Sequence, residues 1–291
     1  MQFENTKVYN FEGAFRGLRN PMNSWNKSDS YFGLTDIYNT DSLTDVIDSW
    51  IQYENIGRSE RNLEPYGLDM VNSNEYYDKC DEYNEWLAIQ GILASHDDIC
   101  EVAFLGPNDL HLAQRLILAG SEHAKFTRQI FISVDITAPI YFFKEFDTYK
   151  VGTTANSTST MHKLTSAPIT REMFEWDKGD DLIIASGTAP HSDGWEFTFD
   201  DYIEDVVDIC EKLRQKYLET NDKRYWRALI QYLPQSFLQT RTWTADYAVL
   251  RNIYKQRRSH RLKEWHEFCN WIKTLPYAED LIILEDTDET Y

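Results

Sequence analysis

The segment RQIFISVDITAPIYFFKEF, residues 128–146, limits the fold of this chain more than any other stretch. In its first half, β-branched residues occur at every second position: Ile130, Ile132, Val134 and Ile136. This is the period of a half-buried strand. Pro139 lacks the backbone N–H that a strand ladder needs, and its fixed φ suits the start of a helix. The segment therefore predicts a strand that ends at Pro139 and a helix that starts after it.

A run of short polar side chains follows in YKVGTTANSTSTMHKL, residues 149–164. Such runs are commonly solvated loops whose side chains bond to their own backbone. The hydroxyl and backbone N–H groups of a turn can also bind phosphate or ribose oxygens without adding charge. The triplet at 156–158 is an N-glycosylation pattern as well, which matters only in a secreted protein. The first two interpretations stay open from these residues alone.

Charge and hydropathy restrict the partners. The formal net charge of -19 over 291 residues would repel a phosphate polymer or an anionic membrane, so we expect neither a nucleic-acid polymer nor a membrane as partner. There is no leader pattern and no run of about 18 apolar residues, which favours a cytoplasmic protein. Basic residues gather in RNIYKQRRSHRLK, residues 251–263, which is either a solvated helix face or a seat for phosphate or carboxylate.

Several chemistries lack their sequence signals. The histidines show no HExxH spacing, so we expect no metal site. Dinucleotide-binding, P-loop and GxSxG patterns do not occur. The widely spaced cysteines include no CxxC pair, and we expect reduced and mostly buried thiols at Cys80, Cys100, Cys210 and Cys269.

Elsewhere the pattern is mostly helical. We expect one or two helices over 76–102, and a short amphipathic helix with Asn108 as N-cap and Gly120 as stop. A helix is expected over 198–219, with apolar residues on or near one face at Val206, Val207, Ile209, Cys210 and Leu213. Residues 224–274 are predicted to be mostly helical, with a break at Pro234 and a new start after Thr244. The stretch 165–196 reads as irregular apart from a strand-like LIIAS, and no regular element is assigned to RGLRNPMNSWNKSDS near the N-terminus.

The order of helix, strand, proline, helix start and hydroxyl-rich loop, with the residues in it, resembles the flavin-dependent thymidylate synthase family. That family has a histidine before the strand, a segment like APIF..RQ and the signature RHRxxSxNExSxRY. Here His123, APIYFFKEF and TYKVGTTANSTSTM occupy these places. Later elements recur at matching intervals, at Leu233, Pro234, Trp243, Thr244, Asn252 and Arg257. The resemblance covers roughly residues 108–164 and 224–271.

The signature is altered on its flavin side. Thr148, Tyr149 and Lys150 stand where the family's Arg-His-Arg faces the flavin, so one cation remains. The residues that the resemblance assigns to cofactor binding are His123, Thr148, Tyr149, Lys150 and Asn252.

At the positions that face the substrate, the hydroxyl groups of the signature are retained. Thr153 and Thr158 replace the two serines of the signature, while Ala155 removes its asparagine and Asn156 its carboxylate. The resemblance assigns substrate binding to Glu145, Thr153, Asn156, Thr158, Thr160 and Arg227. It gives Arg257 the catalytic role, because a cation against the pyrimidine stabilises charge on O2 or O4 as C5 becomes nucleophilic. Glu145 replaces an amide and could accept a hydrogen bond from the amine of cytosine, which uracil lacks.

The resemblance implies an α+β fold of the flavin-dependent thymidylate synthase type, with an antiparallel or mixed sheet and flanking helices. It implies a homotetramer that acts at C5 of a deoxypyrimidine monophosphate, by dUMP methylation or a related one-carbon transfer to dUMP or dCMP, with FAD, NADPH and methylenetetrahydrofolate. The alternative is a nucleotide-binding or structural relative that has lost flavin chemistry. We expect an N-terminal extension (1–107), a core (108–277) with an insertion at about 165–222, and an acidic tail (278–291).

Overall fold

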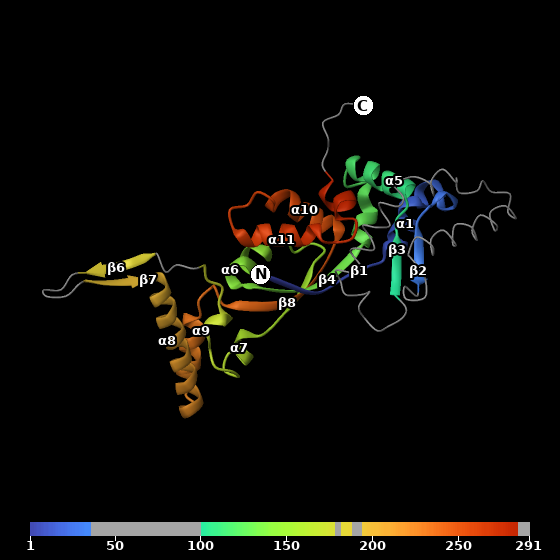
Figure 1. Cartoon of the computed structure of the whole chain (residues 1–291). Coiled ribbons are helices and arrows are strands. Elements are labelled where there is room, and N and C mark those ends of the chain that lie inside the picture. The colour runs from blue at the N-terminus through green and yellow to red at the C-terminus, as the bar shows by residue number, and fades with distance from the viewer. Residues whose placement is uncertain (36–99, 178–181, 188–193, 285–291) are drawn as a thin grey trace. The chain divides into compact units, whose positions relative to one another are not determined.

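The structure is a computed structural model, and it describes residues 1–35, 100–177, 182–187 and 194–284. Its strands are β1 (Gln2–Tyr9), β2 (Tyr31–Thr35), β3 (Cys100–Phe104), β4 (Phe131–Pro139), β5 (Thr154–Ser157), β6 (Ile183–Gly187), β7 (Trp195–Thr198) and β8 (Leu238–Asp246). Its α-helices are α1 (Phe11–Arg19), α5 (Pro107–Leu118), α6 (Ile140–Phe146), α7 (Thr160–Lys163), α8 (Phe199–Thr220), α9 (Lys223–Tyr232), α10 (Tyr247–Arg257) and α11 (Lys263–Lys273) (Figure 1). None of the described helices is long and apolar enough to span a membrane.

Helices and antiparallel strands occur together, which confirms the α+β class. One sheet has the strand order β1-β4-β8-β5, and two-stranded antiparallel ribbons are formed by β2 with β3 and by β6 with β7. The chain divides into two compact units. Unit 1 comprises 1–4, 134–150 and 154–243, and unit 2 comprises 5–133, 151–153 and 244–291. The domain boundary expected at residue 108 stays a prediction.

The strand predicted from alternating isoleucines is β4. Ile132, Val134 and Ile136 are buried, and the strand ends at Pro139, which is the N-cap of α6. Strand β8 was not predicted, and the expectation of mostly helix over 224–274 is wrong there. The threonines at 240, 242 and 244 alternate with other residues in a β-branched, period-two pattern that favours a strand. The next helix starts after Thr244, as expected, and Asp246 caps it by accepting from the backbone N–H of Val249 at 2.8 Å.

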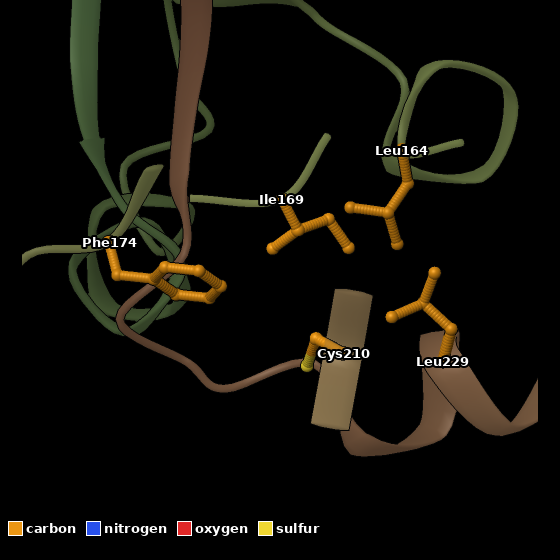
Figure 2. Close-up of a cluster of buried hydrophobic side chains, with 5 residues drawn as sticks. All are labelled: Leu164, Ile169, Phe174, Cys210 and Leu229. Atoms are coloured by element: carbon orange, nitrogen blue, oxygen red, sulfur yellow. The ribbon is translucent and has the colours of Figure 1, made fainter. Parts of the chain in front are cut away.

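Unit 1 has an apolar cluster in which the segment that links α7 to β6 packs against α8 and α9. Leu164, Ile169, Phe174, Cys210 and Leu229 form it (Figure 2). A hydrogen bond to Glu211, whose charge is paired with Arg214 on the same helix, fixes the linking segment to α8. The carboxylate of Glu211 accepts from the backbone N–H of Ile169 at 2.7 Å and from the guanidinium of Arg214 at 2.7 Å. Arg214 holds the pKa of the Glu211 carboxyl at about 2, well below its ordinary value of 4.5.

Helix α8 has a less regular apolar face than its sequence predicts. Cys210 is buried, and Val206, Val207 and Leu213 pack against the cluster. Ile209, which was placed on or near the same face, is 51% exposed. Positions 209 and 210 are about 100° apart around a helix, so both cannot face the same core equally. The helix starts as predicted, because Thr198 and Asp201 form a reciprocal capping box.

Unit 2 is built around aromatic side chains of α1, α10 and α11. The rings of Phe11 and Tyr247 meet edge to face at 5.8 Å, and the hydroxyl of Tyr247 donates to the carbonyl of Pro276 at 2.8 Å. A π-helical turn, η6 (Glu279–Ile283), closes this unit, with Leu281 and Ile282 buried. The first residues of the expected acidic tail thus form η6, and residues 285–291 lie outside the described part.

Helix α5 begins one residue before the predicted cap. Pro107 is its first residue, so Asn108 lies inside the first turn, where its backbone N–H donates to the carboxylate of Asp29 at 2.8 Å. Gly120 follows the helix with φ 109°, as its predicted role as a stop requires. Burial of the Asp29 carboxyl raises its pKa from 3.8 to about 6, with the charge of Asp109 as the second cause.

Two further expectations are only partly covered. The helices expected over 76–102 lie largely outside the described residues, and the last three residues of that range belong to β3 instead. RGLRN, which was given no regular element, completes α1 and enters a 3-10 turn, η1 (Asn20–Met22). Cys210 and Cys269 are free and buried, which confirms the prediction for these two thiols.

Candidate functional site

Most of the hydroxyl-rich stretch, from residue 154 to 164, lies in unit 1 and is fixed to strand β8. The backbone N–H of Thr158 donates to the carbonyl of Thr240 at 2.9 Å, and the backbone N–H of Thr240 donates to Oγ1 of Thr158 at 3.3 Å. Oγ1 of Thr240 is also 2.7 Å from Oγ1 of Thr137, on β4. Three threonines from three chain segments are thus joined across the strand order β4-β8-β5.

Part of the polar run serves the backbone, as the simpler interpretation predicts. Ser159 is the N-cap of α7 and accepts from the backbone N–H of His162 at 3.2 Å. Two hydroxyls that flank the run do the same: that of Ser166 donates to the carbonyl of Lys163 at 2.6 Å, and that of Thr148 donates to the carbonyl of Glu145 at 2.8 Å. These hydroxyls satisfy helix ends and turns, where free backbone groups need partners.

The same stretch lines a pocket of about 130 Å³. Its polar side is formed by Thr158, Ser159, Thr160, Thr240 and Lys163, and its apolar side by Leu164, Ala167, Met173, Phe237 and Leu238. We call this the hydroxyl pocket. Among the residues that line it, Lys163 alone carries a charge. In the part of the chain that the structure describes, the Lys163 ammonium has no hydrogen-bond or ion-pair partner.

The apolar wall of the pocket is supported by contacts between three aromatic rings. Phe237 meets Phe174 edge to face at 5.6 Å, and Phe174 stacks on Trp176 at 5.9 Å. Phe174 and Phe237 also face each other in an isolated antiparallel bridge. Because Phe174 belongs to the cluster of Figure 2, the shape of the pocket depends on the packing of that cluster.

The pocket unites two predicted substrate residues, Thr158 and Thr160. The other predicted residues of unit 1 do not line it. Glu145 is half-buried on α6, Asn156 is exposed on β5 and Arg227 is exposed on α9. Sequence reasoning missed Lys163 and Thr240. The alternating threonines of β8 were a signal for Thr240, whereas no local pattern distinguishes Lys163 from other surface lysines.

Unit 2 holds the remaining predicted residues. Arg257 is the last residue of α10, and its guanidinium carbon lies 4.8 Å from the ring centroid of Trp265, a cation–π contact. His123 is exposed at the start of η4 (Ala124–Gln129), and Thr153 is half-buried in the turn after Gly152. The side-chain oxygen of Asn252 accepts from Gln256 at 2.9 Å.

Arg241, an arginine of unit 1, is already engaged. Arg241 on β8 makes an ion pair with Asp147 at 2.6 Å, and its guanidinium carbon lies 3.9 Å from the ring centroid of Phe143. Its side chain is 13% exposed. Arg241 therefore joins β8 to the end of α6 and is not an open anion seat.

The residues that the resemblance assigns to flavin binding do not offer the cationic contacts that the family's Arg-His-Arg triplet would give a flavin. Thr148 uses its hydroxyl to close α6, where it donates to the carbonyl of Glu145. Lys150 is exposed and is the one cation in the triplet that replaces Arg-His-Arg. A charged cofactor loses favourable contacts when its cationic partners are replaced by neutral ones. The donor set of this turn thus differs from the one that the resemblance requires.

No protein-family model and no curated protein sequence matches the chain. Among solved structures, the chain is similar to the flavin-dependent thymidylate synthase of Helicobacter pylori complexed with FAD and dUMP. The identity is 16% and the TM-score 0.42, over 70% of this chain and 93% of that one. It is also similar to a UMP/dUMP methylase from Streptomyces cacaoi bound with 5-Br dUMP. Here the identity is 14% and the TM-score 0.43, over 69% of this chain and 90% of that one. Both TM-scores are below 0.5, so any assignment of a substrate or cofactor rests on the chain's own residues.

Proposed function

We propose that this chain is a relative of the flavin-dependent thymidylate synthases that binds a deoxypyrimidine monophosphate at the hydroxyl pocket. One observation carries the proposal. Thr158 and Thr160, which the sequence resemblance assigns to substrate binding, line the same pocket as Lys163. Hydroxyl donors beside an ammonium group suit a phosphomonoester, because hydrogen bonds to an ionised acceptor are about twice as strong as neutral ones.

The size of the pocket indicates which end of the nucleotide enters it. Pockets that enclose a complete small ligand measure roughly 300–1,000 Å³. The hydroxyl pocket, at about 130 Å³, takes a smaller group. We therefore assign it to the phosphate, with the sugar at its rim and the base outside. Lys163 then supplies the charge that the family's closing arginine would supply at position 160.

The first candidate activity is an enzymatic one. The chain would act at C5 of dUMP or dCMP, by methylation or a related one-carbon transfer, with FAD, NADPH and methylenetetrahydrofolate. Arg257 would stabilise charge on the pyrimidine, and Glu145 would favour the amine of cytosine. This candidate includes a homotetramer and a cytoplasmic location, and it rests on the resemblance of residues 108–164 and 224–271.

The second candidate is a nucleotide binder without flavin chemistry. The chemistry of the 147–150 turn favours it, because the Thr148 hydroxyl is engaged with the backbone and Lys150 is the one cation left in the triplet. In this candidate the hydroxyl pocket retains its ligand, while the cofactor positions have lost theirs. The two candidates differ in catalysis and in the binding of FAD, and FAD binding is the property to measure first.

Calorimetry and absorbance test the proposal in sequence. The purified chain is first titrated with dUMP, dCMP and deoxyuridine. We expect both monophosphates to bind more tightly than the nucleoside, and equal affinity for nucleoside and monophosphates, or no binding, would contradict the proposal. The chain is then incubated with FAD and desalted. Retained flavin absorbance supports the enzyme candidate, and a colourless chain that still binds nucleotide supports the second.

A further inference from the structure

A series of side-chain hydrogen bonds in unit 1 runs from the turn after α6 to the hydroxyl pocket. Arg241 donates from Nη1 to the carboxylate of Asp147 at 2.6 Å and from Nε to the side-chain oxygen of Gln239 at 3.0 Å. The side-chain nitrogen of Gln239 donates in turn to the carbonyl of Thr158 at 2.9 Å. Asp147 is therefore joined to the pocket residue Thr158 through two side chains of β8, Gln239 and Arg241, which we call the bridging pair.

The Arg241 end of the bridging pair is held firmly. Besides its ion pair with Asp147, the guanidinium lies over the ring of Phe143, which is itself buried. The side chain of Arg241 is 13% exposed, whereas that of Asp147 is 51% exposed. A guanidinium group is planar and presents its N–H donors in fixed directions. Arg241 thus offers Gln239 a donor whose position is set by both Asp147 and Phe143.

Arg241 also determines which way the amide of Gln239 faces. The two residues are two positions apart in β8, so their side chains leave the same face of the strand. The amide oxygen of Gln239 accepts from Arg241, and its nitrogen donates to Thr158. A rotated amide would bring two donors together at Arg241 and two acceptors together at Thr158. The contact with Arg241 therefore keeps the donor of Gln239 on the pocket side.

The bond to the Thr158 carbonyl orients a peptide group at the pocket. This carbonyl and the backbone N–H of Ser159 belong to the same peptide group, which is planar and trans, so they point in opposite directions. By holding the carbonyl, Gln239 also sets the direction of the Ser159 N–H. Thr158 and Ser159 both line the hydroxyl pocket, and Gln239 is not among the described residues that line it. Gln239 can thus act on a ligand only through Thr158 and Ser159.

We infer that Gln239 and Arg241 are positioning residues of the hydroxyl pocket, and that the turn at 147–150 acts on the ligand of this pocket through them. The inference rests on the proposed function, in which the ligand is a deoxypyrimidine monophosphate with its phosphate in the pocket. It gives Asp147 a part in substrate binding, beside the positions that the resemblance assigns to the cofactor. Arg241 acts through geometry, because Asp147 already compensates its charge.

Calorimetry on the full chain tests the pocket end of this connection. Gln239→Met removes the donor to Thr158, and one hydrogen bond of ordinary strength corresponds to about fivefold in affinity. We therefore expect dUMP to bind about fivefold more weakly. Deoxyuridine, which has no phosphate to place in the pocket, should bind as it does to the wild type. Gln231→Met, at an exposed glutamine of α9, is the control and should change neither affinity. Wild-type dUMP affinity in Gln239→Met would overturn the inference.

Asp147 tests the far end, and here the sign of the effect is informative. Removal of a carboxylate lowers the negative charge of the chain, so charge alone would tighten the binding of an anion. Asp147→Ala should instead weaken dUMP binding, by about twofold to fivefold, because Arg241 loses its anchor. Asp147→Asn keeps an oxygen acceptor and should retain most of the affinity. Asp205→Ala, at an exposed carboxylate of α8, is the control for charge. Unchanged or tighter binding in Asp147→Ala would overturn the inference.

The double variant shows whether the two ends act as one. Asp147 influences the pocket only through Gln239, so Asp147→Ala should weaken dUMP binding no further in a chain that already carries Gln239→Met. Residues with independent roles would instead multiply their losses, as distant and unconnected sites do. Multiplied losses would therefore contradict the connection.

Hydrogen exchange of the ligand-free chain separates this inference from the proposed function. Gln239→Met and Asp147→Ala should each speed exchange of the backbone amides over 155–164, and should leave exchange over α8 unchanged. Wild-type exchange over 155–164 in both variants would overturn the inference, whatever the chain binds. If the wild type does not bind dUMP but exchange rises in both variants, the proposed function fails while the bridging pair keeps its positioning role.

Discussion

Thr158 and Thr240 hold each other by two hydrogen bonds, one of which uses the Thr158 hydroxyl as acceptor at 3.3 Å. One wall of the hydroxyl pocket thus depends on a side chain as well as on backbone pairing. Thr158→Val keeps the shape but removes the acceptor, so we expect the free energy of unfolding to fall by about 1 kcal/mol. Urea unfolding measures this, and calorimetry should show weaker dUMP binding. Thr158→Ser should retain most of both properties, and equal losses in the two variants would contradict a role for the hydroxyl.

Lys163 should matter for the phosphate and not for the nucleoside. A hydrogen bond to a charged group contributes about 1.5–3 kcal/mol, so Lys163→Met should weaken dUMP binding about tenfold or more. Deoxyuridine affinity should hardly change. Lys223→Met is the control, because Lys223 is an exposed lysine of α9 outside the pocket lining. If Lys163→Met binds dUMP as the wild type does, the phosphate lies elsewhere.

Glu145 should set the preference between the two pyrimidines. A carboxylate can accept from the exocyclic amine of cytosine, whereas it has no donor to meet at O4 of uracil. We expect tighter binding of dCMP than of dUMP, and Glu145→Gln should reduce or reverse this order. Competitive calorimetry with both nucleotides measures the ratio. A wild-type preference for dUMP would remove this role for Glu145.

The sequence predicted a strand or helix correctly where the residues of that segment alone show its periodicity and its ends. The isoleucine alternation and Pro139 predicted β4 and its end, and the capping pattern before α8 agrees with the helix expected there. Strand β8 could not be predicted in this way. Its alternation is one of threonines with mixed partners, and only Trp243, Ala245 and Asp246 in it are buried. Its polar residues do not indicate a strand that pairs with a neighbour on each side, although β8 pairs with β4 and with β5.

The pocket could be predicted only in part for a related reason. Thr158 and Thr160 belong to a recognisable stretch, but Thr240 joins them from a segment about eighty residues further along the chain. Lys163 becomes notable only because the pocket lies beside it. Contacts of this range are set by tertiary packing, which no short window of sequence contains.

The ion pair of Glu211 and Arg214 should stabilise unit 1, and this stabilisation should be lost at acidic pH. The pKa of Glu211 is lowered from 4.5 to about 2, so the folded chain binds fewer protons than the unfolded one between these values. The contribution is therefore complete above pH 4.5 and is lost as the pH falls towards 2. Arg214→Met should lower the free energy of unfolding by about 2 kcal/mol near neutral pH, and by less in acid. Lys212→Met, on the same helix, is the control. A pH-independent loss would contradict the assignment.

Asp29 should have the opposite effect on the pH dependence of stability. Burial raises the pKa of its carboxyl from 3.8 to about 6, so the folded chain binds more protons than the unfolded one between these values. The group therefore costs stability as the pH rises through this window, by at most roughly 3 kcal/mol. Asp29→Asn cannot titrate, although it keeps one acceptor for the N-terminal N–H groups of α5. Relative to the variant, the wild type should be more stable at about pH 4 than at about pH 7 in urea unfolding. Asp205→Asn, on the surface of α8, should show no such difference, and a parallel pH profile of wild type and Asp29→Asn would rule out a raised pKa at Asp29.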